Sequence, residues 1–527
     1  MLNSKQILFS LAIFLWAFSI EAQNKPSAAT PSSANDLFKY TNYTEALKEY
    51  QQLLKSDPKN EKYNYRIGYC YLMTNISKAK AVPYLEIASR SEDADPDVLF
   101  DLGRAYHVAY RFDDAIKAYT KFKTSGKGSA QNKSRVDKYI QYSYNAKELV
   151  KYPLNVTFTN LGKDVNSISA DYCPYVPADE SFLIYNSRRK ETGTPFKNGN
   201  FTSVVFISVV KDGKFTKGKP IGTPISSGIG DDEIVGLSSK GDVLLMMYSN
   251  NIDFATLNIS YSEKAQRFEK TQRLPDAINT GGHEFAGSIS PDGNTIYFVS
   301  NRPGGYGGGD LYVTKKLPNG NWGPAQNLGP EINTADEEDY PNISPDGKTL
   351  FFSSNGRSSM GGFDIFTAAY VDSTNTWKNV KNFGYPVNTP EDDRNLRLSI
   401  DGRHGYIAAV REGGLGDLDI YRVDFNDIEQ KLALRLGTIA STDTTKKINF
   451  SDAFITVTNS ETNEVFGNYL ANPNTGRYVI ILPVGEYVLS VEASGFKPYE
   501  EKLIVEEKVS IRQETNKNIV LVPEGKK

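Results

Sequence analysis

The sequence holds few of the residues from which metal centres, disulfide frameworks and catalytic sites are usually built. Its 527 residues include two cysteines and three histidines, at Cys70, Cys173, His107, His283 and His404. No Cys-x-x-Cys, His-Glu-x-x-His, Gly-x-Ser-x-Gly or Walker-type pattern occurs. We therefore expect no metal, no cofactor and no enzymatic activity. A chain of this length does not need disulfides to hold its core, so we expect both cysteines to be buried and unpaired.

The net charge is also low. A formal charge of −3 gives no long-range field that would attract nucleic acid or an anionic membrane, so neither is an expected partner.

The amino end differs in composition from the rest of the chain. Lys5, an apolar run over residues 7–20 and the small Ala22 are typical of a secretory signal peptide, here residues 1–23, with an uncleaved anchor as the alternative. No cysteine directly follows the run to carry a lipid, and no later segment is apolar enough to span a membrane. We expect export to the periplasm, association with the outer membrane, and a linker over residues 24–35.

Residues 36–150 carry a helical repeat. Ala46, Ala81 and Ala115 recur at intervals of 35 and 34 residues, and Gly68 and Gly103 are 35 residues apart. Small residues at these positions let paired helices approach closely. The pattern resembles the tetratricopeptide repeat, with about three copies and a final helix over residues 134–150.

Such a stack implies a concave surface that holds a partner segment. Tyr65, Tyr69, Tyr106 and Tyr110 are the candidates to line it. Aromatic residues at helical spacing are also typical of packing inside a stack, and this alternative stays open.

A second repeat covers residues 152–427. Ser-Pro-Asp-Gly at residues 290–293 and 344–347 precedes an apolar run and a Gly-rich turn, and weaker copies lie at 177–180, 238–241 and 399–402. Pro-Asp-Gly favours a tight turn, and the apolar run suits a buried strand. The copies are 52 to 61 residues apart, which leaves room for four strands each. We therefore predict a five-bladed all-β propeller.

Another repeated segment lies between these copies, and we interpret it as the outer strand of each blade. One version, at residues 156–167, precedes the first blade, whereas the last blade stops at Phe425 without one. The strand over residues 154–160 should therefore complete the last blade and close the ring. These repeats resemble the WD-like propeller repeats of TolB-type proteins.

An acidic residue lies eight positions before the turn aspartate, or its equivalent, in every copy. The five are Asp171, Asp232, Glu284, Glu338 and Asp393. Equivalent positions in a closed propeller form a ring around its axis. The acids either accept hydrogen bonds from neighbouring turns, which is the interpretation we favour, or bind a cation or a basic partner segment at the channel mouth.

The carboxyl-terminal residues 432–523 show short alternating strands. Gly-Arg-Tyr at 476–478 and Leu-Pro-Val-Gly-Glu-Tyr at 482–487 resemble the carboxypeptidase regulatory-like domain. That resemblance implies a small antiparallel β-sandwich without catalytic residues.

The order of the three segments resembles the PorE-like periplasmic proteins of Bacteroidetes, which are associated with type IX secretion and gliding machinery. The resemblance implies a scaffold for cell-envelope proteins, with a PorP/SprF-like outer-membrane protein as one candidate partner. The alternative is a propeller that senses a glycan or peptide at its channel mouth. Those relatives usually continue into an OmpA-like domain, so direct peptidoglycan binding is not expected here; a chain that continues beyond Lys527 stays an alternative.

Overall fold

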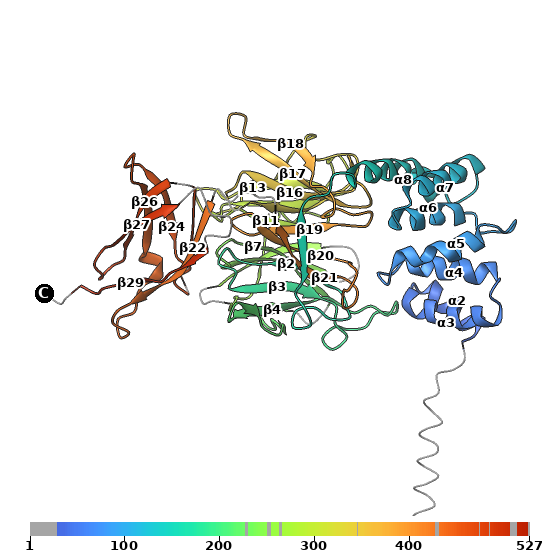
Figure 1. Ribbon diagram of the computed structural model, residues 1–527, viewed down its shortest axis with the longest axis horizontal. Helices are drawn as coiled ribbons and strands as arrows, with labels where there is room; N and C mark the ends of the chain where they lie inside the picture. The colour runs from blue at the N-terminus through green and yellow to red at the C-terminus, as the bar shows by residue number, and fades with distance from the viewer. Residues whose placement is uncertain are drawn as a thin grey trace, which may run out of the picture.

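The computed structural model describes residues 29–226, 230–249, 255–262, 266–344, 346–426, 432–473, 475–483, 485–505 and 514–524. The predicted signal peptide and the first part of the predicted linker lie outside these ranges. A helical segment lies on one side of a central group of sheets, and a smaller β domain lies on the other (Figure 1). None of the helices in the described ranges has the length and apolar character needed to cross a membrane.

The helical segment begins earlier than the composition indicated. The helices are α2 (Pro31–Lys39), α3 (Tyr43–Ser56), α4 (Glu61–Leu72), α5 (Ala81–Ala88), α6 (Val98–Val108), α7 (Phe112–Ser125) and α8 (Ala130–Leu149), with a 3-10 turn η1 (Lys78–Lys80). The linker prediction is therefore wrong from Pro31 onward, because Thr30 and Ser33 form a capping box and Pro31 occupies the first turn. The last helix starts at Ala130 and not at residue 134, since the Ser129 side chain caps it.

The predicted close approach of paired helices is confirmed at both glycines. A Cβ atom on Gly68 would lie 2.5 Å from the Leu85 side chain, and one on Gly103 would lie 2.4 Å from the Tyr119 ring. The alanines of the repeat are fully buried. The interval near 34 residues therefore reflects one packing contact made twice along the stack.

The central region is built from five sheets within the described residues. The first contains β2 (Asp171–Tyr175), β3 (Phe182–Ser187), β4 (Val204–Lys211), β5 (Lys214–Phe215) and β6 (Lys219–Pro220). The second contains β7 (Asp231–Leu237), β8 (Val243–Ser249), β9 (Ala255–Tyr261) and β10 (Gln272–Arg273). The third contains β11 (Glu284–Ile289), β12 (Thr295–Ser300), β13 (Asp310–Lys315) and β14 (Gln326–Asn327).

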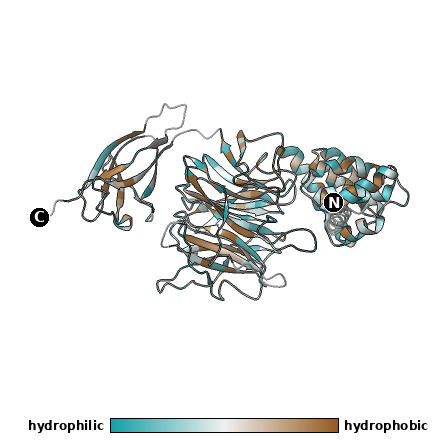
Figure 2. Ribbon diagram, turned by 90° about the horizontal axis from the view of Figure 1, so that it is seen from below, coloured by the Kyte–Doolittle hydropathy of each residue, from teal (hydrophilic) through white to brown (hydrophobic). Residues whose placement is uncertain are grey.

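The two remaining sheets complete a ring. The fourth contains β15 (Glu338–Ile343), β16 (Thr349–Ser354), β17 (Asp364–Val371) and β18 (Thr376–Asn382), and the fifth contains β19 (Arg394–Leu398), β20 (His404–Ala409), β21 (Asp419–Phe425) and β1 (Val156–Asn160). The β1 strand pairs antiparallel with β21, from Val156 opposite Phe425 to Asn160 opposite Tyr421, which is the predicted closure. Hydrophobic residues alternate with polar ones along the strands of the ring (Figure 2).

Hydrophobic clusters hold the sheets side by side. One cluster joins each sheet to the next along the chain. A further cluster joins the fifth sheet to the first, where Ile420 packs with Leu183 and Tyr185. The ring is therefore closed by apolar packing as well as by the pairing of β1 with β21.

Buried asparagines connect the outer loops of the ring to its strands. Each of four accepts a hydrogen bond from the N–H of one strand residue and donates to the C=O of the same residue. The pairs are Asn166 with Ile420, Asn279 with Leu257, Asn333 with Leu311 and Asn388 with Ile365. The Asn that recurs in the sequence thus makes the same two hydrogen bonds to the backbone of a strand residue each time.

The carboxyl-terminal domain is a sandwich of two sheets around one hydrophobic cluster. One sheet contains β22 (Leu432–Ser441), β25 (Arg477–Pro483), β28 (Glu514–Asn516) and β29 (Ile519–Leu521), and the other contains β24 (Val465–Leu470), β23 (Phe454–Asn459), β26 (Gly485–Glu492) and β27 (Tyr499–Val505); the short turn η2 (Phe450–Asp452) precedes β23. The prediction of a wholly antiparallel sandwich is wrong, because β28 and β29 run parallel to β22. The β28 strand follows β27 in the sequence but belongs to the other sheet, so it is not the second strand of a hairpin with β22.

Side chains of α6, α7 and α8 dock the helical segment on the ring. His107 is buried, and its Nε2–H donates to the carbonyl oxygen of Met360 at 2.8 Å. Phe112 and Ala146 pack on the Met360 side chain. Further hydrogen bonds join Tyr142 to the carbonyl of Asn355 and Asn145 to the carbonyl of Ser359. The two domains therefore share a small core.

Candidate functional site

The five predicted acidic residues lie at the start of the first strand of each sheet, and all are buried. Glu338 shows the arrangement: it accepts from the N–H of Thr334 at 2.7 Å, from the Thr334 hydroxyl at 2.8 Å and from the Ser354 hydroxyl at 2.8 Å. The other acids accept from Ser or Thr residues in the loop before them: Asp171 from Ser167, Asp232 from Ser226, Glu284 from Thr280 and Asp393 from Thr389.

Each carboxylate is therefore directed at its own loop, as expected for a residue that holds a turn. Arg189 pairs with Asp171 and Arg302 with Glu284, so two of the acids also have a cationic neighbour. No group of three or more His, Cys, Asp or Glu side chains in the described part of the chain is placed to hold a metal ion. Burial raises the pKa of Glu338, and it raises the pKa of Asp393 to about 7.

The four predicted tyrosines do not form one surface. Tyr65 and Tyr69 lie together, with ring centroids 6.1 Å apart. The Tyr106 hydroxyl donates to Glu86 on the neighbouring α5. Tyr110 is 45% exposed and its ring lies against Tyr385 of the central ring. Tyr110 therefore lies at the domain junction, and among these four residues a ring contact is made by Tyr65 and Tyr69 alone.

An arginine and tyrosine cluster surrounds the first pair. The Tyr65 hydroxyl donates to the buried carboxylate of Asp101 at 3.0 Å, and Arg104 pairs with the same carboxylate at 3.2 Å. Burial raises the pKa of Asp101 to about 6, an effect that Arg104 opposes. The Arg66 guanidinium lies 4.0 Å above the centroid of the Phe38 ring. We call Tyr65, Arg66, Tyr69 and Arg104 the helical cluster.

Arg66, unlike the neighbouring Arg104, forms no ion pair with a carboxylate of the described residues. The described residues provide it with no carboxylate partner, and its Nε atom is buried without a hydrogen-bond acceptor. A guanidinium that lies on an aromatic ring and lacks an acid is suited to receive a carboxylate from another molecule. The sequence pattern gave no indication of this residue, because its role depends on rings from two helices.

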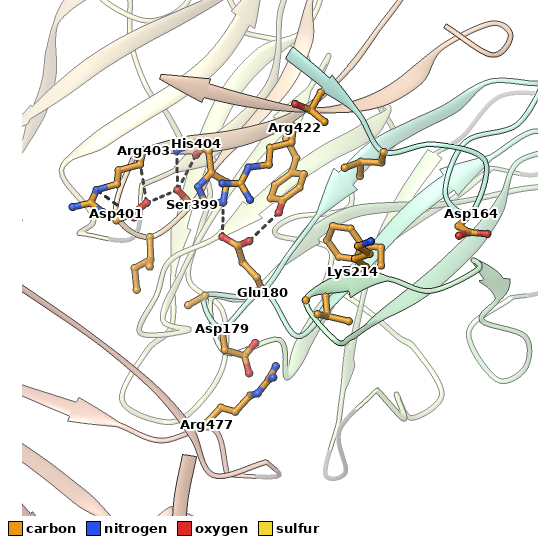
Figure 3. Close-up of a pocket in the computed structure, with 18 of the residues that line it drawn as sticks. Asp164, Asp179, Glu180, Lys214, Ser399, Asp401, Arg403, His404, Arg422 and Arg477 are labelled. Carbon is orange, nitrogen blue, oxygen red and sulfur yellow. Dashed lines mark hydrogen bonds and ion pairs between the residues drawn. The ribbon is translucent and has the colours of Figure 1, made fainter. Parts of the chain in front are cut away.

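A cavity of about 650 Å³ lies at the opposite side of the ring, between its first and fifth sheets (Figure 3). Glu180 lies at its centre, paired with His404 at 2.7 Å and accepting from the Tyr406 hydroxyl at 2.9 Å. Arg477 of the carboxyl-terminal domain lies beside Asp179 in the same view. The cavity therefore collects charged groups from two domains.

Ser399, Asp401 and His404 near this cavity do not form a nucleophile and base. The Ser399 hydroxyl hydrogen bonds with Asp401 and with the backbone of His404, which are contacts of a tight turn. The His404 ring is directed at Glu180 instead. This arrangement holds the turn and provides no activated hydroxyl.

A second cavity, of about 570 Å³, lies where the helical segment faces the axis of the ring. The first strands β2, β7, β15 and β19 are edge strands of their sheets, and each contributes residues to its wall. Asn75 and Lys78 of the helical segment complete it and contact Asp417 and Glu391 of the ring. We call this the axial pocket. Sequence reasoning missed it because its walls come from segments hundreds of residues apart.

Both cysteines are free and buried, as predicted.

Comparisons with known proteins bear on the helical segment. Residues 33–76 and 77–130 match the family model of the tetratricopeptide repeat. A search of the curated proteins finds no match.

Solved structures give distant likenesses. TolB from Acinetobacter baumannii is 16% identical with a TM-score of 0.32, over 49% of this chain and only 55% of that chain. A glycoside hydrolase is 9% identical with a TM-score of 0.36, over 53% of this chain and 94% of that chain. The periplasmic gluconolactonase of Pseudomonas aeruginosa is 12% identical with a TM-score of 0.27, over 63% and 88%. TM-scores this low carry no argument about function. Residues 33–130 thus form a helical segment similar to tetratricopeptide repeats, docked on a closed ring of sheets.

Proposed function

We propose that the protein is a non-enzymatic scaffold that binds other cell-envelope proteins through its helical repeats. Tetratricopeptide repeats generally mediate protein–protein interaction, and their stacks present an extended binding surface. The ring and the sandwich present further exposed strands, and the helical segment is docked on the ring. This arrangement suits a protein that holds its partners in fixed positions.

The observation that carries this proposal is the unpaired Arg66 on the helical cluster. Arginine and tyrosine side chains are enriched among residues that dominate binding energy. An acidic side chain or a terminal carboxylate of a partner would pair with Arg66 while its neighbouring residues pack on the Tyr69 ring. We therefore expect an acidic partner segment at this surface.

The finer assignment follows the resemblance of the domain order. On that resemblance we propose that the protein lies in the periplasm near the outer membrane of Bacteroidetes, after removal of a signal peptide, and is associated with type IX secretion or gliding machinery. We likewise propose that the ring is a five-bladed TolB-type propeller and that a PorP/SprF-like outer-membrane protein is a candidate partner. These assignments rest on sequence resemblance to PorE-like proteins.

Affinity capture from envelope extracts tests the proposal against the alternative of a ligand-sensing propeller. The scaffold predicts stoichiometric capture of envelope proteins, which is lost in Arg66→Gln and kept in Arg90→Gln, an exposed arginine outside the helical cluster. A protein that captures no such partner and binds soluble glycans instead would support the sensor and refute the scaffold.

A further inference from the structure

We propose that the axial pocket binds an extended, uncharged peptide segment of a partner protein, and that the Asn395 side chain holds one of its peptide groups. This inference rests on the proposed scaffold function and adds a second binding site to it. The site lies on the ring and its junction with the helical segment, and no residue of the helical cluster belongs to its lining.

The first observation is an unsatisfied amide in the wall of the pocket. Asn395 is 3% exposed, and neither its Oδ1 nor its Nδ2 atom has a hydrogen-bond partner in the described chain. Buried polar groups in native proteins are nearly always paired, and an exception requires an explanation. A ligand that brings both a donor and an acceptor would satisfy this side chain.

The second observation is what buried asparagines do elsewhere in the ring. Asn388 shows the pattern: its Oδ1 accepts from the N–H of Ile365 at 2.8 Å, and its Nδ2 donates to the C=O of the same residue at 2.8 Å. Asn166, Asn279 and Asn333 make the same pair of bonds to strand residues. In these four cases the complement of the Asn side chain is therefore a residue in an extended chain.

Backbone conformation does not explain the choice of asparagine at position 395. Asn395 has φ of 60°, a left-handed conformation in which Asn is common. The equivalent positions in the first and fourth sheets, two residues after the acid, carry Cys173 and Tyr340 with φ of 51° and 45°. Each follows or lies within a bulge in its strand, so the bulge sets the conformation whichever side chain is present. The backbone at position 395 therefore does not require an asparagine, and a binding role would account for its amide.

The charges around the pocket favour an uncharged segment. Lys78 pairs with Glu391, Arg188 with Asp231 and Glu233, and Arg394 with Asp339 and Asp392. The other charged side chains of the lining are held by hydrogen bonds: Asp393 accepts from Thr389, Asp417 accepts from Asn75, and Arg411 donates to the carbonyl of Pro386. A charged ligand would compete with these contacts. A peptide group brings a dipole and no net charge, so it can enter while the pairs stay intact.

The size of the pocket fits such a segment. Its volume of about 570 Å³ lies within the range of about 300–1,000 Å³ that ligand pockets span. Neighbouring side chains cover the amide of Asn395, so we expect binding to include a rotamer change at the pocket wall, which is common at protein interfaces.

The test uses the full chain and a displayed library of short random-sequence peptides. Selected peptides are synthesised, and their affinity is measured by fluorescence anisotropy for the wild type, Asn395→Cys and Arg66→Gln. We expect uncharged peptides whose affinity falls about tenfold or more in Asn395→Cys and is unchanged in Arg66→Gln. Cysteine is the residue that the first sheet carries at this position, and its introduction should leave the melting temperature unchanged or higher, because the removed amide has no partner.

Three results would overturn the inference. The library could give no binding peptide, or the selected peptides could bind the wild type and Asn395→Cys equally. The third result is that Asn395 is needed for binding to glycans on a parallel array but not for binding to peptides. None of them bears on the scaffold proposal, which the capture experiment with Arg66→Gln tests separately. A loss of thermal stability in Asn395→Cys would show that the amide has a structural partner, and would equally count against the proposal.

Discussion

Removal of the Glu338 carboxylate should destabilise the ring without any involvement of a metal. In Glu338→Ala, the N–H of the partly buried Thr334 loses its acceptor, the fully buried Glu338 carboxylate, at 2.7 Å. The O–H groups of Thr334 and Ser354 lose the same acceptor, although each hydroxyl oxygen still accepts from a backbone N–H, that of Asp336 or Gly356. Removal of a buried hydrogen-bond acceptor costs about 1–3 kcal/mol, so we expect the free energy of unfolding to fall by about that amount. For a domain of this size, that is a fall in melting temperature of about 2–10 °C.

The assay is thermal melting of the wild type, Glu338→Ala and Glu337→Ala, each with calcium and with a chelator. Glu337 is the exposed neighbour on the same loop and serves as the matched control, with a change near zero expected. The loss in Glu338→Ala should be the same with calcium and with chelator. A large calcium-dependent rise in the wild-type melting temperature that disappears in Glu338→Ala would refute this reasoning and establish a metal site. An unchanged melting temperature would refute the hydrogen-bond account.

Three further predictions follow from packing, titration and ring closure. Gly103→Ala should cost about 1–3 kcal/mol by overpacking on the Tyr119 ring, whereas Gly281→Ala, whose new methyl meets nothing within 4 Å, should not; chemical denaturation of both variants checks this. Because burial raises the pKa of Asp393 to about 7, the folded protein keeps a proton that the unfolded chain releases near pH 4. Stability should therefore fall as the pH rises from about 4 to about 7, and Asp393→Asn should reduce that fall in denaturation curves. A chain that begins at Ser169 lacks β1 and leaves β21 as an exposed edge, so it should aggregate and melt less cooperatively than one that begins at Tyr152; equal behaviour would refute closure by β1.

The parts of the fold that the sequence predicted are those where one local contact recurs. The turn chemistry after each first strand, the acid that accepts from a loop residue and the glycine beside a facing helix each impose the same residue at each repeat. The outer-strand copy at residues 156–167 identified β1 as the partner of β21 for this reason. Repetition makes such positions visible without a structure.

The parts that the sequence could not predict depend on contacts made once between distant segments. His107 meets Met360 across 253 positions, and neither residue belongs to a repeat. The axial pocket likewise exists only because the helical segment docks on the ring. Composition does not predict the start of α2 for a different reason. Pro31 and Ser33 are typical of a linker, but Thr30 as the N-cap and Pro31 in the first turn also begin a helix. Tyr110 was assigned to a partner surface, but it lies against Tyr385.

The most direct test of the account is the affinity of a captured envelope protein for the wild type, Arg66→Gln and Arg90→Gln, measured by calorimetry with purified components. If the helical cluster is the partner surface, Arg66→Gln should weaken binding by more than about tenfold while Arg90→Gln leaves it unchanged, and both variants should melt like the wild type. Equal affinities for all three proteins would contradict the account and place partner binding elsewhere on the molecule.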